Sequence, residues 1–123
     1  MNFDFSDEQR ALQSEVQRFL SDRADLSVAR TVLDDDDACF AEPVWRELVE
    51  LGWAGMAIPE HYGGVGLGYL ELCVLAEELG RSLAPVPFSS TIYLFAEAIL
   101  RVADENVKAQ MLPAVAAGDI IGT

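Results

Sequence analysis

A segment rich in glycine and proline, residues 51–68, most constrains the fold, because it separates two apolar helical patterns and is itself neither helix nor ordinary linker. Gly52 follows a helical run, where a left-handed residue can end a helix. Pro59 lacks a backbone donor and biases Ile58 toward an extended conformation. Positive φ or close backbone approach is then available at four glycines: Gly63, Gly64, Gly66 and Gly68.

The same segment is unusually apolar for a connector, since it contains Trp53, Met56, Ile58 and Leu67. We therefore expect it to pack against something and expect the chain to be part of a larger assembly. If other domains are missing, an exposed apolar face is expected around Trp53, Met56, Ile58 and the fourth helix, and the isolated chain is expected to self-associate through it.

Apolar periodicity predicts an all-α bundle of five to six helices. Ser6 and Gln9 form a capping-box pattern that opens the first helix, at residues 7–24. A second helix begins at Pro43, which suits the first helical position, and ends at Gly52. The first helix carries a single apolar stripe: Leu12, Val16, Phe19 and Leu20.

Residues 25–41 form the least patterned part of the chain. The run Asp34–Asp37 resembles a metal site only superficially, because adjacent side chains point in different directions and no EF-hand spacing is present. A solvated loop or a frayed helix end is the favoured interpretation.

The third helix, from Leu70 to Gly80, is almost continuously apolar and is expected at the centre of the bundle. Cys73 is interpreted as a small core residue rather than a nucleophile. Glu77 and Glu78 are general-base candidates by type, but neighbouring helical residues diverge by about 100°. A solvated or interdomain face is favoured for both.

A fourth, amphipathic helix is expected from about residue 89 to Ala103, after two prolines that break the third. A fifth begins at Asp104, is interrupted by Pro113 and ends near Gly118. Residues 119–123 are strand-like without a partner strand, so they either pair with missing sequence or form a loose tail. One hydroxyl residue can cap the fourth helix: Ser89, Ser90 or Thr91.

Composition limits the function classes. The 123 residues suit one domain, and 51% hydrophobic and 24% charged residues indicate a globular chain. A net charge of −13 argues against nucleic acid and anionic membranes as partners. Two cysteines without metal spacing fit a reducing compartment, and no signal peptide or membrane-spanning stretch is recognisable, so a cytoplasmic location is expected.

The residues alone form no complete active site. His61 is the only histidine, and neither a di-iron Glu-x-x-His pair nor a Gly-x-Ser-x-Gly elbow is present. The glycine-rich loop does not fit the dinucleotide or P-loop patterns. No catalytic, cofactor-binding or metal-ligating residue is therefore assigned in this chain.

Residues 53–67, Trp-Ala-Gly-Met-Ala-Ile-Pro-Glu-His-Tyr-Gly-Gly-Val-Gly-Leu, resemble the acyl-CoA dehydrogenase family. Further pieces occur in family order and at family-like spacing, so the resemblance covers nearly the whole chain. These pieces are Asp7-Glu8-Gln9, Glu78-Leu79-Gly80-Arg81, Leu112-Pro113 and Ala117-Gly118-Asp119.

The resemblance implies that residues 1–123 are the helical N-terminal domain of a three-domain flavoenzyme, whose middle β domain and C-terminal helical domain are absent from this chain. Such enzymes carry out α,β-dehydrogenation of an acyl-CoA thioester, with hydride passing to FAD. The flavin-binding strand should begin beyond Thr123, and the catalytic glutamate lies in the C-terminal domain. The isolated chain is therefore expected to be inactive and not to bind FAD tightly.

In this family the segment leading into the fourth helix helps to wall the acyl pocket. The resemblance thus makes Val86, Ser90 and Tyr93 candidate pocket-lining residues, with ordinary packing within the bundle as the alternative. The implied partners are an acyl-CoA substrate, the remaining domains and, in the intact enzyme, like or unlike subunits.

Two other interpretations stay open. The chain could be a free-standing helical interaction module, or a non-catalytic subunit completed by another polypeptide. The strand-like end favours truncation over these, because an unpaired apolar edge promotes aggregation. An acyl-CoA oxidase or nitroalkane oxidase relative would share the fold and differ at residues near the flavin.

Overall fold

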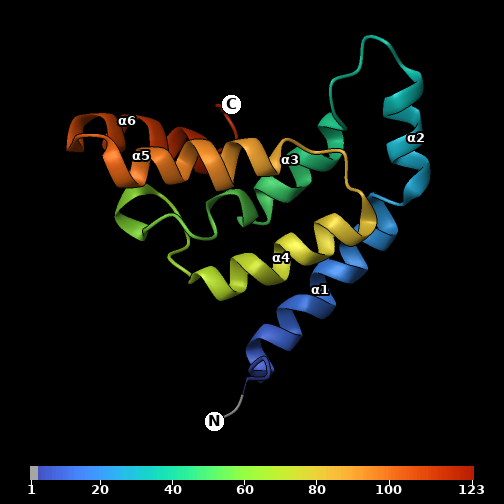
Figure 1. Cartoon of the computed structure of the whole chain (residues 1–123), viewed down its shortest axis with the longest axis horizontal. Coiled ribbons are helices and arrows are strands. Elements are labelled where there is room, and N and C mark those ends of the chain that lie inside the picture. Colours follow the sequence, from blue (N-terminus) through green and yellow to red (C-terminus); the bar gives the residue numbers. More distant parts are fainter. Residues whose placement is uncertain (1–2) are drawn as a thin grey trace. The chain divides into compact units, whose positions relative to one another are not determined.

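The computed structural model describes residues 3–123, and this range contains six α-helices, short 3-10 helices, one π-helix and no strand (Figure 1). The all-α prediction is confirmed. Two compact units can be distinguished. Unit 1 comprises the chain up to residue 41 together with residues 69–85, and unit 2 comprises residues 42–68 and 86–123. Among the residues described, no helix has the length and apolar character needed to cross a membrane.

Unit 1 is built from α1 (Asp7–Arg23), α2 (Leu26–Asp34) and α4 (Tyr69–Ser82). The predicted capping box opens α1. The Ser6 hydroxyl accepts a hydrogen bond from the Gln9 amide at 3.2 Å, and the Gln9 side chain accepts one from the Ser6 amide at 3.0 Å. Two orphan donors of the first turn are satisfied in this way, so α1 begins where the sequence predicts.

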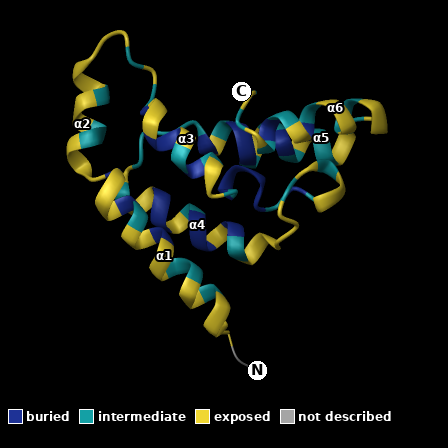
Figure 2. Ribbon diagram, turned by 180° about the vertical axis from the view of Figure 1, so that it is seen from behind, coloured by how far each residue is buried: buried dark blue, intermediate teal, exposed yellow. Residues whose placement is uncertain are grey.

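The interior of unit 1 lies where α1 packs along α4 (Figure 2). Val16 and Leu20 are the buried apolar residues of α1, and both belong to its predicted stripe. A polar bond also joins the two helices, since the Gln9 amide side chain donates to Glu71 at 2.9 Å. The buried apolar side chains of α4 are Leu72, Val74, Leu75 and Leu79.

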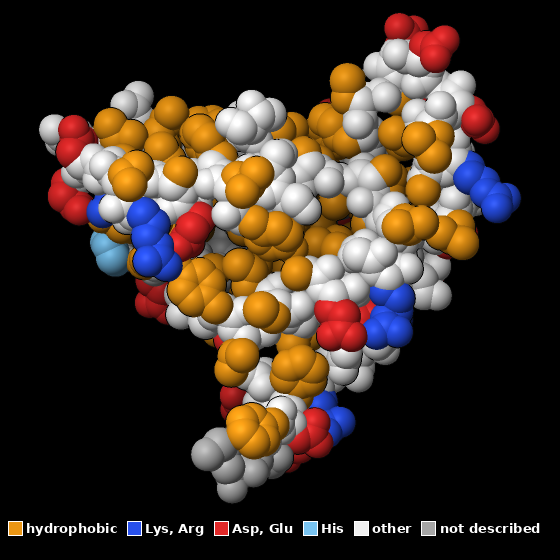
Figure 3. Space-filling model, in the orientation of Figure 1, with side chains coloured by type: hydrophobic (Ala, Val, Ile, Leu, Met, Phe, Trp, Pro, Cys, Tyr) orange, Lys and Arg blue, Asp and Glu red, His pale blue; other side chains and the backbone are white. Residues whose placement is uncertain are grey.

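The helix α2 lies in the segment for which the sequence showed no clear pattern. Asp25 caps it by accepting a hydrogen bond from the Ser27 amide at 2.8 Å. None of its residues is buried; Val28, Ala29 and Val32, which recur at helical spacing, are only half-buried. Asp34 ends the helix and Asp35–Asp37 are exposed in the following loop, as expected of a solvated acidic run; Figure 3 shows acidic side chains gathered at this loop.

Three predictions for α4 were wrong in detail. The helix continues through Gly80 to Ser82, and Cys73 is exposed rather than part of the core. Glu78, expected on a solvated or interdomain face, is only 2% exposed. The reason for both side-chain errors is that α1 covers the face that carries Glu78, which leaves Cys73 on the uncovered side.

Unit 2 contains three α-helices and three helices of other types. Gly52 ends the first of them with φ of 80°, as predicted. In chain order these elements are α3 (Glu42–Glu50), the 3-10 helices η1 (Trp53–Gly55) and η2 (Glu60–Tyr62), the π-helix η3 (Ser89–Ala96), α5 (Glu97–Val102) and α6 (Glu105–Ala116).

The connector is packed, as predicted, but the exposed apolar face expected on it is absent from the described structure. Trp53, Met56 and Ile58 are 4%, 2% and 1% exposed. The segment folds back on itself and lies against α6: a Cβ on Gly55 would come within 3.0 Å of the Ala116 Cβ. The connector therefore buries Trp53, Met56 and Ile58, whereas Leu67, the fourth apolar residue on which the prediction rested, is exposed.

The predicted fourth helix is present but begins as η3, a π-helix, before it becomes α5. Its apolar face is as expected, with Ile92 and Ala96 buried. No side chain caps it, because Phe88 occupies the N-cap position in a helical conformation. Exposed apolar side chains do occur along this stretch, at Leu94 and Val102, and Figure 3 shows hydrophobic side chains over η3 and α5.

Asp104 caps α6 as predicted, since its carboxylate accepts a hydrogen bond from the Val107 amide at 2.9 Å. The predicted interruption at Pro113 was wrong. Pro113 lies in the last turn, where its fixed φ suits a helix and its missing donor removes only one bond. The chain then turns at Gly118, with φ of 75°, where the helical run was predicted to end.

The C-terminal end, residues 119–123, is neither a strand in the described structure nor a loose tail. Gly122 is buried, and its backbone is hydrogen-bonded to the Thr91 side chain of η3. The segment is tied to η3 by these bonds, and no strand of the range 3–123 is available to pair with it.

Candidate functional site

The segment 86–93 leads into η3 and carries the three residues predicted to line a pocket. Val86 precedes the π-helix, whereas Ser90 and Tyr93 lie within it, three residues apart in the sequence. All three side chains are half-buried. Ser90 and Tyr93 thus belong to one element, and Val86 lies in the segment that leads into it. Helical segments of π type are rare and frequently occur at functional sites.

Aromatic packing holds Tyr93 in place. Phe88 is buried, and its ring lies 5.4 Å from the Tyr93 ring between centroids, edge to face at 69°. On its other side Phe88 contacts the Trp45 ring of α3 in a similar arrangement, at 6.4 Å. The Trp45 indole nitrogen is buried and has no hydrogen-bond partner among the residues described. The rings of Trp45, Phe88 and Tyr93 thus restrain one side of the segment 86–93.

The hydroxyl groups of Ser90 and Thr91, which are adjacent in η3, form different hydrogen bonds. The Ser90 hydroxyl donates to the Pro87 carbonyl at 3.4 Å, one turn back. Thr91 is fully buried and bonds to Gly122. The sequence identified Thr91 only as a possible cap, because nothing in the local pattern links it to a residue 31 positions away.

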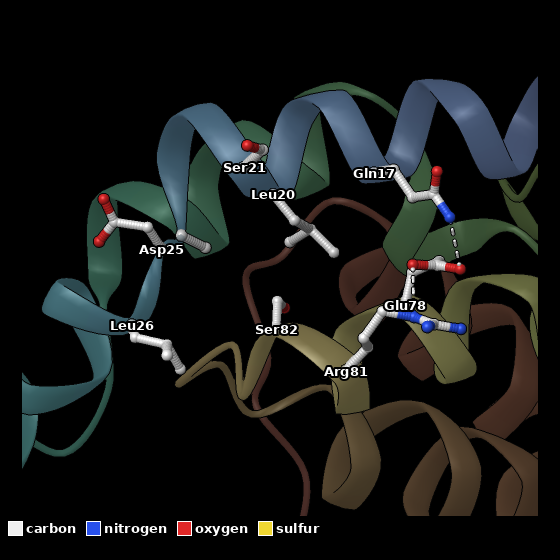
Figure 4. Close-up of a pocket in the computed structure, with 9 residues that line it drawn as sticks. Gln17, Leu20, Ser21, Asp25, Leu26, Glu78, Arg81 and Ser82 are labelled. Carbon is white, nitrogen blue, oxygen red and sulfur yellow. Dashed lines mark hydrogen bonds and ion pairs between the residues drawn. The ribbon is translucent and has the colours of Figure 1, made fainter.

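Unit 1 contains a groove of about 400 Å³ (Figure 4). Leu20, Gln17 and Arg81 contribute to its lining, together with the buried Glu78. One Glu78 oxygen accepts hydrogen bonds from the side-chain amides of Gln13 and Gln17 at 2.9 and 3.0 Å, and the other lies 3.3 Å from the Arg81 guanidinium. The polar side chains around Glu78 are therefore hydrogen-bonded or ion-paired to one another, and we interpret their role as structural.

The glycine-rich loop of the connector does not form a phosphate cradle. Its backbone donors are used inside unit 2: the amides of Val65, Gly66 and Leu67 donate to carbonyls of residues 55–58 at 2.8 to 2.9 Å. Gly64 is packed so closely against the Ile58 carbonyl that a Cβ would overlap it. Turn geometry and close packing therefore explain these glycines, and the loop has no free amides to offer to a dinucleotide phosphate.

A small polar cluster links η2 to α6. The Tyr62 hydroxyl donates to Glu105 at 2.5 Å, and this bond raises the pKa of Tyr62 and lowers the pKa of Glu105. The His61 ring lies 4.0 Å from that of Tyr62, and Lys108 lies 3.5 Å from Glu105. The cluster is exposed and joins two elements, so it serves packing rather than chemistry.

Metal-binding geometry is absent from the described range, where no three His, Cys, Asp or Glu side chains gather closely enough to hold an ion.

The sequence of this chain is similar to those of acyl-CoA dehydrogenases. The sequence model described as "Acyl-CoA dehydrogenase, N-terminal domain" matches residues 6–119. A benzylmalonyl-CoA dehydrogenase of Aromatoleum aromaticum is 42% identical over 66% of this chain and 21% of its own length. A mitochondrial isovaleryl-CoA dehydrogenase of Pongo abelii is 32% identical over 95% of this chain and 28% of its own length.

Among solved structures, the ChsE4–ChsE5 complex from Mycobacterium tuberculosis superposes with a TM-score of 0.87 and 27% identity, over 98% of this chain and 33% of the matched one. The chain thus spans about a fifth to a third of the length of these relatives.

Proposed function

Because the chain belongs to the acyl-CoA dehydrogenase family, as its N-terminal helical domain, we propose that it is part of a flavin-dependent acyl-CoA dehydrogenase. The proposed reaction is the α,β-dehydrogenation of an acyl-CoA thioester, in which bound FAD accepts the hydride. The observation that carries the proposal is the family match over residues 6–119 together with relatives that are named acyl-CoA dehydrogenases.

This chain's own contribution to the reaction is to shape the space for the acyl group. We assign that role to Val86, Ser90 and Tyr93, because their half-buried side chains sit at the start of a π-helix. The edge contact with Phe88 restricts the Tyr93 ring, so the ring can set the width available to a substrate. A pocket of this kind discriminates between acyl groups mainly by size.

The flavin itself is proposed to be held by polypeptide outside residues 1–123. The connector is the only glycine-rich loop in the sequence, and its amides are engaged internally, so the residues present do not fit a dinucleotide phosphate site. The catalytic base is likewise proposed to lie outside this chain. The isolated chain is accordingly expected to be inactive.

The complete protein tests the proposal most simply. It should be expressed from its own gene, loaded with FAD, and assayed with branched, straight and aromatic acyl-CoA thioesters and an artificial electron acceptor. We expect turnover with at least one thioester, and none from the chain 1–123 under the same conditions. Absence of turnover with every thioester in a flavin-loaded protein would contradict the function.

A second candidate is a helical subunit that is completed by an unlike chain. The observation in its favour is the similarity to a structure described as a complex of two different proteins, ChsE4 and ChsE5. Co-expression with the products of neighbouring genes, followed by size-exclusion chromatography, distinguishes the two. A flavin-containing complex of unlike chains would support the subunit, and a flavin-containing complex of identical chains would support the first proposal.

A cytoplasmic location is also proposed. Both cysteines are unpaired and exposed, as expected in a reducing compartment. Fractionation of cells tests this, and the comparison includes a relative that is named mitochondrial.

A further inference from the structure

Thr91 is the most deeply buried polar residue of η3, with 0% exposure. Its hydroxyl oxygen accepts a hydrogen bond from the Gly122 amide at 3.2 Å and donates one to the Gly122 carbonyl at 3.4 Å. A threonine hydroxyl can act as donor and acceptor at once, so one side chain satisfies both backbone groups of a residue 31 positions away. Neither group of Gly122 is then left unpaired in the interior.

Gly122 approaches η3 so closely that no side chain fits between them. A Cβ on this residue would overlap the Phe95 ring, and Gly122 is itself buried. Its φ is not in the left-handed region, so the requirement for glycine here is one of space rather than of backbone conformation. Thr91 and Phe95, four residues apart, thus form one contact surface for the chain end.

The same contact acts on the element that carries two of the candidate residues. Ser90 and Tyr93 lie on either side of Thr91 in sequence, within the same π-helix. A π-helical segment differs from an α-helix in its residue-to-residue rotation, so its side-chain directions depend on what holds it in that form. Bonds from Thr91 to a fixed backbone segment supply such a restraint from the buried side, while the candidate residues occupy half-buried positions.

We propose that Thr91 is a positioning residue for acyl-group specificity: its two bonds to Gly122 hold η3 so that Ser90 and Tyr93 present a fixed wall to the substrate. This inference rests on the proposed function, because only that function makes an acyl group the ligand of Ser90 and Tyr93. Thr91 is fully buried in this structure, so it does not contact the substrate and acts through its neighbours.

The test compares Thr91→Val, which keeps the shape and removes the hydroxyl, with Thr91→Ser, which keeps the hydroxyl. Thr31→Val is the matched control, because the Thr31 hydroxyl also bonds to a backbone carbonyl but lies on the exposed helix α2. The first measurement, in the complete protein, is amide hydrogen exchange. We expect Thr91→Val to raise the exchange rate at Gly122 by about tenfold, and the other two variants to leave it within about twofold.

The second measurement is the ratio of kcat/KM for a short and a long acyl-CoA. We expect Thr91→Val to change this ratio by about tenfold, and Thr91→Ser to restore it. Loss of stability alone would lower the amount of active enzyme without changing the ratio. If Thr91→Val does not fold, Gly122→Ala replaces it, because its added methyl group separates the same two segments.

The outcomes separate this inference from the proposed function. Faster exchange at Gly122 with an unchanged substrate ratio would overturn the positioning role and leave the acyl-CoA dehydrogenase activity standing. Unchanged exchange would overturn the contact itself. A wild-type protein that turns over no acyl-CoA would overturn the proposed function, and the specificity role with it, whatever the exchange experiment shows.

Discussion

The two units hold their elements together in different ways. In unit 1, α1 and α4 are joined by long side chains: Gln13 and Gln17 both reach Glu78. In unit 2, backbone lies against backbone or against a side-chain stem, as where Gly64 meets Ile58 and Gly122 meets Phe95. Long side chains can adapt to a change and close backbone contacts cannot, so the two units should respond differently to the same kind of substitution.

Glycine substitutions should show the largest difference. Gly64→Ala places a methyl group in the Ile58 carbonyl, so we expect unit 2 to lose about 3 kcal/mol of unfolding free energy. Gly80→Ala is the matched change in unit 1. No atom lies within 4 Å of the added methyl, and Gly80 is inside α4, so we expect a gain of about 0.5–1 kcal/mol. Urea denaturation of each variant measures the change in its unfolding free energy. If Gly64→Ala were as stable as wild type, the close packing of Gly64 against Ile58 would be contradicted.

Substitution of the buried carboxylate should have the next largest effect. Glu78→Gln replaces an acceptor of two amide hydrogen bonds by a group that is partly a donor, and we expect a loss of about 2 kcal/mol. Glu77→Gln is the control, since Glu77 is 52% exposed and pairs with Arg81 at the surface. That change should stay within about 0.5 kcal/mol. If thermal denaturation showed equal losses of stability for the two variants, the hydrogen bonds to Glu78 would add no stability beyond that of a surface ion pair.

Helix caps should show no difference between the units. Ser6→Ala in unit 1 and Asp104→Ala in unit 2 each remove a side-chain acceptor from a helix N-terminus. We expect each to cost about 1 kcal/mol. Chemical denaturation of the two variants, side by side, provides the check. A cost confined to one of them would mean that the helix of the other variant is held by tertiary packing alone.

The smallest expected effect concerns the bond between Tyr62 and Glu105. The pKa of Glu105 is lowered below its ordinary 4.5, so the stabilisation exists above that value and is lost as the pH falls through the lowered pKa. The pKa of Tyr62 is raised, so its share is present at neutral pH and is lost only in alkali. Tyr62→Phe should be slightly less stable than wild type at pH 7, and this difference should vanish in strong acid. A difference that persists there, in thermal scans, would exclude the bond as its cause.

Local signals predicted much of the fold. The capping box and stripe of α1, the Asp104 cap of α6 and the glycine that ends α3 depend on residues within a few positions of each other, and the structure has all of them. The cap predicted for the fourth helix is absent. The helix α2 was not predicted. Its apolar residues Val28, Ala29 and Val32 do recur at helical spacing, but the acidic run that follows favoured the interpretation of this segment as a loop.

Features that depend on distant partners were not predictable. Burial of Glu78 requires Gln13 and Gln17, more than 60 positions away along the chain, and the same packing leaves Cys73 exposed. The sequence also did not reveal that η3 is a π-helix, because the spacing of Ile92 and Ala96 fits the apolar stripe of an α-helix as well as that of a π-helix.

The candidate site divides in the same way. Val86, Ser90 and Tyr93 followed from resemblance to a family and not from any local chemical signal, and their role as pocket residues stays a prediction. Thr91 and Gly122 could be recognised only once the fold had brought them together.

The central claim is that the segment around η3 forms a wall of an acyl-CoA pocket. Photo-crosslinking with an acyl-CoA that carries a diazirine on its acyl chain tests it most directly, in the complete flavin-loaded protein, with peptides identified by mass spectrometry. We predict that the label attaches within residues 86–93 and that unlabelled acyl-CoA competes it away. Competable labelling that falls entirely outside this segment would contradict the claim.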